Sequence, residues 1–339
     1  MSATPPSLTA RRPGALRPRD DRVHALRVWI CVATVIVCLP YTLLKAAWVA
    51  GWSVGASIDG FTDTTRVANG VTGALDLVAI LVAITFVAPW GRRIPAFLVA
   101  FPAWIASGLL APVAVGFVIG TPLQLATGGD NPFTRDDGLS PWVFGLVYGG
   151  FVLQAALLVP GFVLYARDRW SVATRGGRAS GGAGTTRPLQ NVLGGIFVVA
   201  ATAFAGLQLS WSLQGSGSYP DPNIPQRTLF AASALAALAG AGATVRLMRG
   251  GRLTRLRLGT IWLGSGITFT STLSDTLRSV ATDAGAWGAT SSSAAEATLI
   301  LFVLLGTLGG AIGGAMRLVE EEGLSRAPSF DQEPGRGVG

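Results

Sequence analysis

Long apolar stretches alternate with shorter polar gaps along most of this chain. A helix that crosses a lipid bilayer needs about 20 predominantly apolar residues. Eight stretches meet this length, at 28–50, 70–90, 94–119, 142–165, 190–213, 228–247, 258–277 and 292–316. The pattern predicts an all-α, polytopic integral membrane protein with eight transmembrane helices.

The gaps between these stretches differ in charge. The gap 120–141 carries three aspartates and one arginine, whereas 166–189 carries five arginines and one aspartate. Counted over every second gap and both tails, 21 arginines lie on one side of the predicted membrane and four on the other. Because arginine-rich segments stay in the cytoplasm, we expect both termini to be cytoplasmic, which agrees with an even number of helices.

The gaps also suggest how the chain is divided. We expect a disordered basic cytoplasmic tail over 1–27, a first four-helix half over 28–165, and a flexible Gly-, Ser- and Arg-rich cytoplasmic linker over 166–189. A second four-helix half follows over 190–316, and a disordered cytoplasmic tail over 317–339.

The two predicted halves share short motifs. Tyr41, Leu44, Lys45 and Trp48 have the spacing of Phe204, Leu207, Gln208 and Trp211, and Trp104, Ser107 and Gly108 have that of Trp262, Ser265 and Gly266. Four helices per half would make this a parallel repeat about an axis along the membrane normal. The alternative is chance similarity between apolar helices. The predicted boundaries place Trp104 and Trp262 at different depths, which does not fit the repeat.

Composition narrows the function further. The chain is 50% hydrophobic and 13% charged, with a mean hydropathy of +0.50, which argues against a water-soluble fold. The net charge of +8 would suit nucleic acid, but the arginines flank apolar stretches, so we expect a lipid bilayer and no nucleic acid. The single histidine, His24, lies in the N-terminal tail, and Cys31 and Cys38 have no metal-binding pattern. We therefore expect no cofactor, no metal and no recognisable enzyme motif.

A layer of polar residues interrupts the apolar stretches near their predicted outer ends. It holds the only lysine of the chain, Lys45, together with Asp76, Gln208 and Glu296, while Gln154 lies at the predicted middle of its helix. Charged side chains inside a membrane usually pair or face a water-filled cavity. These five residues are the candidate polar cavity, with Lys45 and Asp76 as the simplest neutral pair. The alternative is purely structural pairing, or snorkelling of Lys45 towards the headgroups.

The first predicted helix also carries a recognisable pattern, which comprises Pro40, Tyr41, Leu44, Lys45, Trp48 and Gly51. It resembles a pattern in uncharacterised multi-pass membrane proteins of actinobacteria. This resemblance implies a bacterial plasma membrane and implies no activity.

Three functions are consistent with this sequence. The first is a transporter-like protein with an outward-facing polar cavity. The second is a non-transporting membrane partner or lipid-binding subunit, which would bind anionic lipids at cytoplasmic arginines such as Arg246 to Arg257. Its docking surface would be the glycine face of the last helix. The glycine face comprises Gly306, Gly309, Gly310, Gly313 and Gly314. The third function, which is the least favoured, is an intramembrane enzyme.

Overall fold

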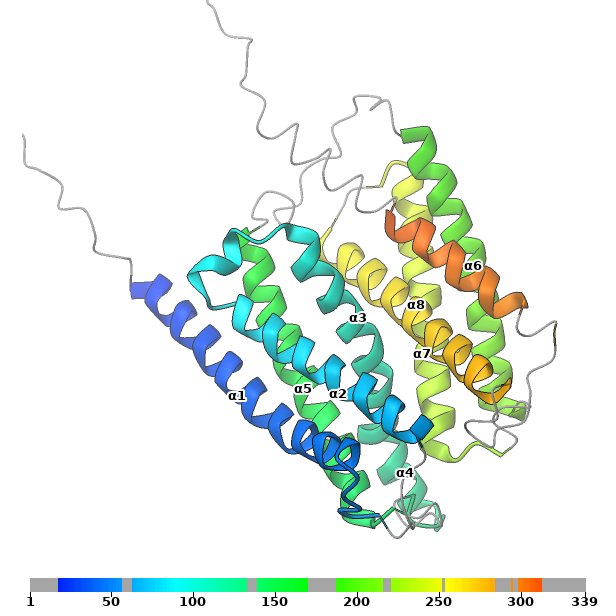
Figure 1. The fold of residues 1–339 in the computed structure, drawn as a ribbon. Helices are drawn as coiled ribbons and strands as arrows, with labels where there is room; N and C mark the ends of the chain where they lie inside the picture. Colours follow the sequence, from blue (N-terminus) through cyan, green and yellow to red (C-terminus); the bar gives the residue numbers. More distant parts are fainter. Residues whose placement is uncertain are drawn as a thin grey trace, which may run out of the picture.

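The computed structural model describes residues 18–56, 63–132, 139–169, 187–215, 221–251, 254–283, 294 and 298–312. Within these ranges the chain is all-α, apart from an isolated bridge between Ala56 and Leu139 (Figure 1). The elements are α1 (Pro18–Val49), α2 (Asp63–Thr85), the 3-10 turn η1 (Pro89–Arg92), α3 (Ala96–Val115), the π-helical turn η2 (Gly116–Gly120), α4 (Thr121–Ala126), α5 (Pro141–Arg169), α6 (Arg187–Gln214), α7 (Ile224–Met248) and α8 (Arg255–Asp283). An apolar helix, Thr298–Ile312, follows α8, and we call it the C-terminal helix.

Six helical segments are long and apolar enough to cross a membrane, which makes this chain a multi-pass membrane protein. The other two predicted spans also fall on helices, α8 and the C-terminal helix. Because α8 is less apolar and the C-terminal helix is shorter, membrane crossing by these two stays a prediction. The six segments are Arg22–Val49, Arg66–Thr85, Phe97–Ala126, Pro141–Arg169, Arg187–Gln214 and Ile224–Met248.

Several helices extend beyond the predicted boundaries. The first begins at Pro18, inside the segment predicted as a tail, and proline suits the first turn because its missing N–H would have no helical partner there. The third continues through η2 and α4 to Ala126. The irregular turn η2 lies between Pro112 and Pro122, which both lack the N–H of a regular helical bond. Residues 1–17, 170–186 and 313–339, which hold most of the predicted tails and linker, lie outside the described residues.

The helices form two groups, which meet through α8 and through the contact of α7 with η2. The first group contains α1, α2, α3 and α5, around a core that includes Phe86, Val99 and Leu158. The second contains α6, α7 and the C-terminal helix, around a core with Phe204 and Val303. Helix α8 packs against both α3 and α7 (Figure 1). Its middle is therefore enclosed by protein, and residues 264–270 are all buried.

This enclosure explains why α8 is less apolar than its neighbours. Thr268, Thr270 and Thr272 are at most 2% exposed, and each hydroxyl donates to a carbonyl one turn earlier in the helix. A hydroxyl satisfied by its own helix carries little penalty when buried. Since protein covers this part of α8, its side chains need not be as apolar as those of a lipid-facing helix.

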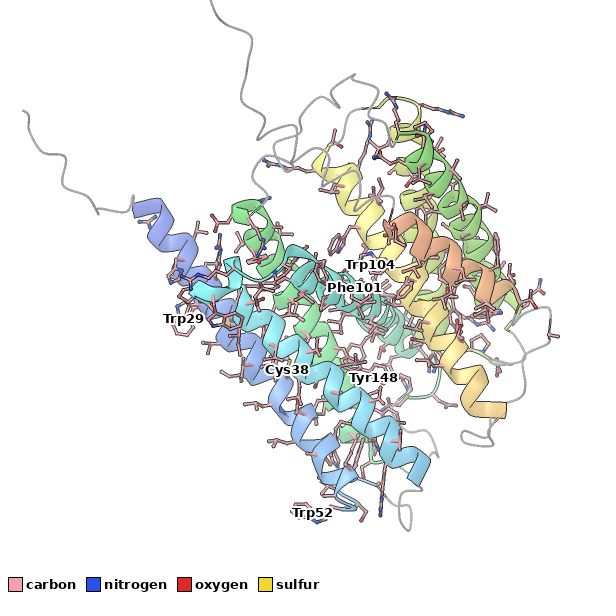
Figure 2. The ribbon with its side chains drawn as sticks, turned by 45° about the horizontal axis from the view of Figure 1, so that its top comes forward. Trp29, Cys38, Trp52, Phe101, Trp104 and Tyr148 are labelled. Carbon is pink, nitrogen blue, oxygen red and sulfur yellow. The ribbon has the colours of Figure 1, made fainter. Side chains whose placement is uncertain are left out.

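The contact between α3 and α8 joins equivalent positions of the two matched motifs. The indole Nε1 of Trp104 donates to Ser265 Oγ at 3.1 Å, and that of Trp262 donates to Ser107 Oγ at 2.9 Å. Figure 2 places Trp104 where α3 faces α8. Trp104 and Trp262 therefore lie at the same level, contrary to the depths expected from the predicted boundaries. The difference arises because α8 begins at Arg255, earlier than predicted.

Arginines hold one end of the first group together. Arg27 forms an ion pair with Asp168, with 3.2 Å between Nη1 and Oδ2. Arg169 at the end of α5 donates from Nη1 to the carbonyl of Gly91 at 2.9 Å and to the hydroxyl of Tyr165 at 2.6 Å. It also donates to the carbonyl of Ile94. These contacts bring the start of α1, the α2–α3 turn and the end of α5 to one end of the bundle.

Candidate functional site

Lys45 reaches towards the start of α2. Its Nζ donates to Asn69 Oδ1 at 2.6 Å and lies 5.0 Å from the ring centre of Tyr41 and 4.9 Å from that of Trp48. Gly73 on α2 makes room for the lysine stem, since a Cβ at that position would lie 3.3 Å from Lys45 Cβ. The ammonium is thus held by one amide oxygen and two aromatic rings, an arrangement that stabilises a cation away from water.

Asp76 occupies the next level of the same helix pair and is 5% exposed. Its Oδ1 accepts a hydrogen bond from Gln154 Nε2 at 3.1 Å, and its Oδ2 accepts one from Thr42 Oγ1 at 3.3 Å. Gln154, on α5, is itself 2% exposed. The carboxyl group therefore joins α1, α2 and α5 at one buried point.

The expected ion pair between Lys45 and Asp76 does not form. In the described part of the chain, the ammonium bonds to Asn69 and the carboxyl group bonds to Gln154 and Thr42. Asn69 and Asp76 are separated by two turns of α2, which is about 10 Å along the helix axis. The lysine stem extends away from Asp76, so each charge has neutral partners. We call the five residues Thr42, Lys45, Asn69, Asp76 and Gln154 the polar cluster.

The structure brings together only part of the predicted cavity. Lys45, Asp76 and Gln154 all belong to the polar cluster. Gln208 is also deeply buried, at 2% exposure, but it lies on α6 in the second group. Glu296 lies outside the described residues. Of the five candidate residues, Lys45, Asp76 and Gln154 therefore lie in the first group, where Asp76 and Gln154 bond to each other, while Gln208 lies in the second group.

Two residues of the polar cluster, Thr42 and Asn69, were absent from the sequence-based prediction. Each had a detectable signal, because Thr42 precedes Lys45 by one turn and Asn69 precedes Asp76 by two turns, on the same helix faces. Neutral polar side chains are common in membrane helices, so they attract less notice than charges. Yet these amides and hydroxyls replace the countercharge that we expected.

The glycine face of the C-terminal helix is turned towards the protein. A Cβ on Gly306 would lie 2.8 Å from Ala200 Cβ, and one on Gly310 would lie 2.5 Å from Phe197 Cβ, both on α6. Gly309 likewise faces Leu193. These three glycines therefore allow close packing within the molecule, and the predicted outward docking surface is wrong for them. Gly313 and Gly314 lie outside the described residues.

The chemistry of the polar cluster is that of binding and charge placement. The described residues hold no group of three His, Cys, Asp or Glu side chains that would suit a metal ion. The cluster combines one cation, one carboxyl group and three neutral hydrogen-bonding side chains. Such a set can bind a polar solute or stabilise the bundle.

Comparison with models of protein families, with curated proteins and with solved structures finds no match. The function must therefore be argued from the geometry of this chain.

Proposed function

We propose that this protein is a transporter-like membrane protein in which the polar cluster binds the transported solute. The observation that carries this proposal is the buried carboxyl group of Asp76, which joins α1, α2 and α5, together with the ammonium of Lys45 held between α1 and α2. Charges inside a membrane are costly and commonly mark solute or ion pathways. Among the six candidate spans, Asp76 is the only charged residue that lies more than five residues from either end of its span.

The partners of the two charges suggest what kind of solute would bind. The amide oxygen of Asn69 accepts a hydrogen bond from Lys45, while the amide of Gln154 and the hydroxyl of Thr42 donate to Asp76. A neutral partner is easier to replace than a countercharge. A small solute with an acceptor group for Lys45 and a donor group for Asp76 would fit this pattern. Amino acids carry both groups and are the first class to test.

The architecture that accompanies this proposal is a parallel repeat of four membrane helices, eight in total. Its main support is the crosswise bonding of Trp104 to Ser265 and of Trp262 to Ser107. When equivalent residues contact each other reciprocally, the contact has the pattern of a two-fold interface. The axis would pass between α3 and α8, along the membrane normal. The distribution of arginines supports cytoplasmic termini, and the resemblance of the first helix supports a bacterial plasma membrane.

The alternative is a non-transporting subunit that binds anionic lipid. The observation in its favour is the group of arginines around the α7–α8 turn, where Arg246, Arg249 and Arg255 are exposed. Arginines at a membrane surface attract anionic headgroups. Under this alternative, the polar cluster only stabilises the bundle, and the internal packing of Gly306 and Gly310 removes one route for docking a protein partner.

Electrophysiology of proteoliposomes on a solid-supported membrane separates these functions. Wild-type protein is challenged in turn with amino acids, primary amines and sugars. We expect currents with at least one amino acid, and a decrease of at least about tenfold for Asp76→Asn and Lys45→Met. A matched control is Thr202→Ala, which changes an exposed residue of α6 and should keep the current. Absence of current with every class, together with tight binding to anionic vesicles, would favour the lipid-binding alternative.

A further inference from the structure

Gln208 is an unusual buried residue in the second group of helices. It is 2% exposed, and its Oε1 accepts no hydrogen bond from any described residue. A buried carbonyl oxygen without a donor lowers the stability of the folded state. Such groups are rare in native proteins, and a bound water molecule or ion is one explanation for them. The described neighbours of Gln208 supply no donor for its Oε1.

The surroundings of Gln208 repeat those of Lys45. Tyr41 and Trp48 lie one turn before and one turn after Lys45, and both rings contact its ammonium. Phe204 and Trp211 hold the same positions relative to Gln208 and are 2% and 3% exposed. Residues spaced by three and four positions lie on one helix face. The side chain of Gln208 thus leaves α6 between two buried aromatic residues.

The surroundings of Lys45 and of Gln208 differ in whether the chain itself supplies a cation. In the first group, the Lys45 ammonium lies among Tyr41, Trp48 and the amide oxygen of Asn69. In the second, an amide oxygen and aromatic residues are present, and the chain supplies no ammonium from that position. We propose that the site at Gln208 binds a small ammonium-type cation, either the ammonium ion or a primary amine. This inference goes beyond the transport proposal and rests on the repeat that accompanies it.

The chemistry favours an ammonium group over other occupants. An ammonium donates a hydrogen bond to a carbonyl oxygen and is attracted to aromatic faces, so one oxygen and two rings satisfy it. A buried water molecule needs two to four polar partners. The indole of Trp211 packs edge-on against Phe230 of α7, with 5.8 Å between ring centres, which makes the surroundings more aromatic still.

Thermal unfolding of the purified full-length protein in detergent tests this site. The probe is ammonium chloride, exchanged for sodium chloride at neutral pH and constant ionic strength. Ligand binding to the folded state raises the midpoint temperature, and we expect a rise of roughly 2–4 °C at saturation. Methylammonium should act similarly. Potassium should have no greater effect than sodium, because it donates no hydrogen bond.

Two variants link the response to Gln208. Gln208→Leu removes the acceptor and should abolish the ammonium response. Gln208→Glu keeps a side-chain oxygen at the same distance from the helix and should retain the ammonium response. A wild-type protein with equal midpoints in both salts, or a Gln208→Leu variant that keeps the response, would overturn the proposal. Loss of the Gln208 response leaves the transport proposal standing if Asp76→Asn still abolishes solute currents.

Discussion

At the scale of single residues, the buried carboxyl group of Asp76 illustrates how a charge is accommodated inside this bundle. It accepts hydrogen bonds from two neutral side chains on two other helices. Hydrogen bonds to charged groups contribute more than those between neutral groups. The stability of the first group should therefore depend on Gln154 more strongly than on the lysine nearby.

A double-mutant cycle on Asp76 and Gln154 measures this dependence. We expect Asp76→Ala and Gln154→Ala to be coupled by about 1–3 kcal/mol, because each removes the partner of the other. The measurement is the free energy of unfolding in detergent. The same cycle on Asp76 and Lys45 provides the control and should be closer to additive, since no bond joins them. A larger coupling for Lys45 than for Gln154 would contradict the observed contacts.

Arg169 offers a second residue to test, at the end of the bundle predicted to be cytoplasmic. Its guanidinium binds the carbonyls of Gly91 and Ile94, which flank the η1 turn. Lysine cannot donate in the same forked geometry. We therefore expect Arg169→Lys to lower the free energy of unfolding by about 1–3 kcal/mol. Arg167→Lys, on an exposed position of the same helix, should change it by less than about 0.5 kcal/mol.

At this scale, the sequence indicated that Lys45, Asp76 and Gln154 are polar residues within apolar helices, but it did not indicate their bonding partners. Helix periodicity places a residue on a face and at a level of the helix. It does not determine which way a long side chain extends. Lys45 has four rotatable side-chain bonds, and its contacts with Tyr41 and Asn69 decide its direction. The ion pair was predicted from the positions of Lys45 and Asp76 along their helices. It does not form because the side chain of Lys45 extends towards Asn69.

At the scale of elements, α3 and α8 approach each other closely at Gly108. A Cβ at Gly108 would collide with the carbonyl of Gly266, and it would lie 2.8 Å from the hydroxyl of Thr270. Both neighbours are fixed parts of a buried helix. The two helices can approach this closely because glycine has no side chain.

Alanine at Gly108 should therefore separate α3 from α8. We expect Gly108→Ala to destabilise the protein by about 2 kcal/mol or more, since backbone must move to relieve the overlap. Gly206→Ala is the matched control, because a Cβ there meets no atom within 4 Å. That control should be neutral or slightly stabilising, since alanine favours helix. Equal stability of the two variants, measured by thermal unfolding, would contradict the described packing.

Helix positions followed from the sequence better than helix ends did. Each of the eight predicted spans falls on a helix, because apolar length is a strong signal. The start of α1 at Pro18 and the start of α8 at Arg255 were missed. In both cases the additional turns are polar. A hydropathy pattern detects only the apolar part of a helix, so it does not show that the helix continues into polar residues. The late predicted start of α8 also produced the apparent mismatch in depth between Trp104 and Trp262.

At the scale of the whole molecule, the orientation in the membrane remains a prediction. The arginine contacts at Asp168 and Gly91 gather the start of α1, the α2–α3 turn and the end of α5 at one end. The bridge between Ala56 and Leu139 joins the segments that follow α1 and precede α5. This arrangement agrees with helices that alternate in direction, as the distribution of arginines predicts.

Cysteine labelling from outside intact cells tests the orientation. In a background without Cys31 and Cys38, an impermeant maleimide should modify Ser53→Cys and leave Thr254→Cys unmodified, since both positions are exposed in the folded chain. The predicted loop positions Ser57 and Ser218 should also react, and Ser180 should not, although these three lie outside the described residues. External modification at Thr254 or Ser180 would reverse the predicted orientation.

The enclosure of α8 has a consequence for how the protein is made. The middle of α8 holds Thr268, Thr270 and Thr272, which gain little free energy from contact with lipid. The free energy of inserting α8 alone into the bilayer should therefore be only weakly favourable. The helices that α8 packs against, α3 and α7, are synthesised before it. They can therefore pack against α8 as it enters the membrane. Insertion of α8 should therefore depend on earlier helices, and a fragment that contains α8 without α3 and α7 should integrate poorly into microsomal membranes in a glycosylation-reporter assay. The same reporter fused to the complete chain up to α8 should integrate well.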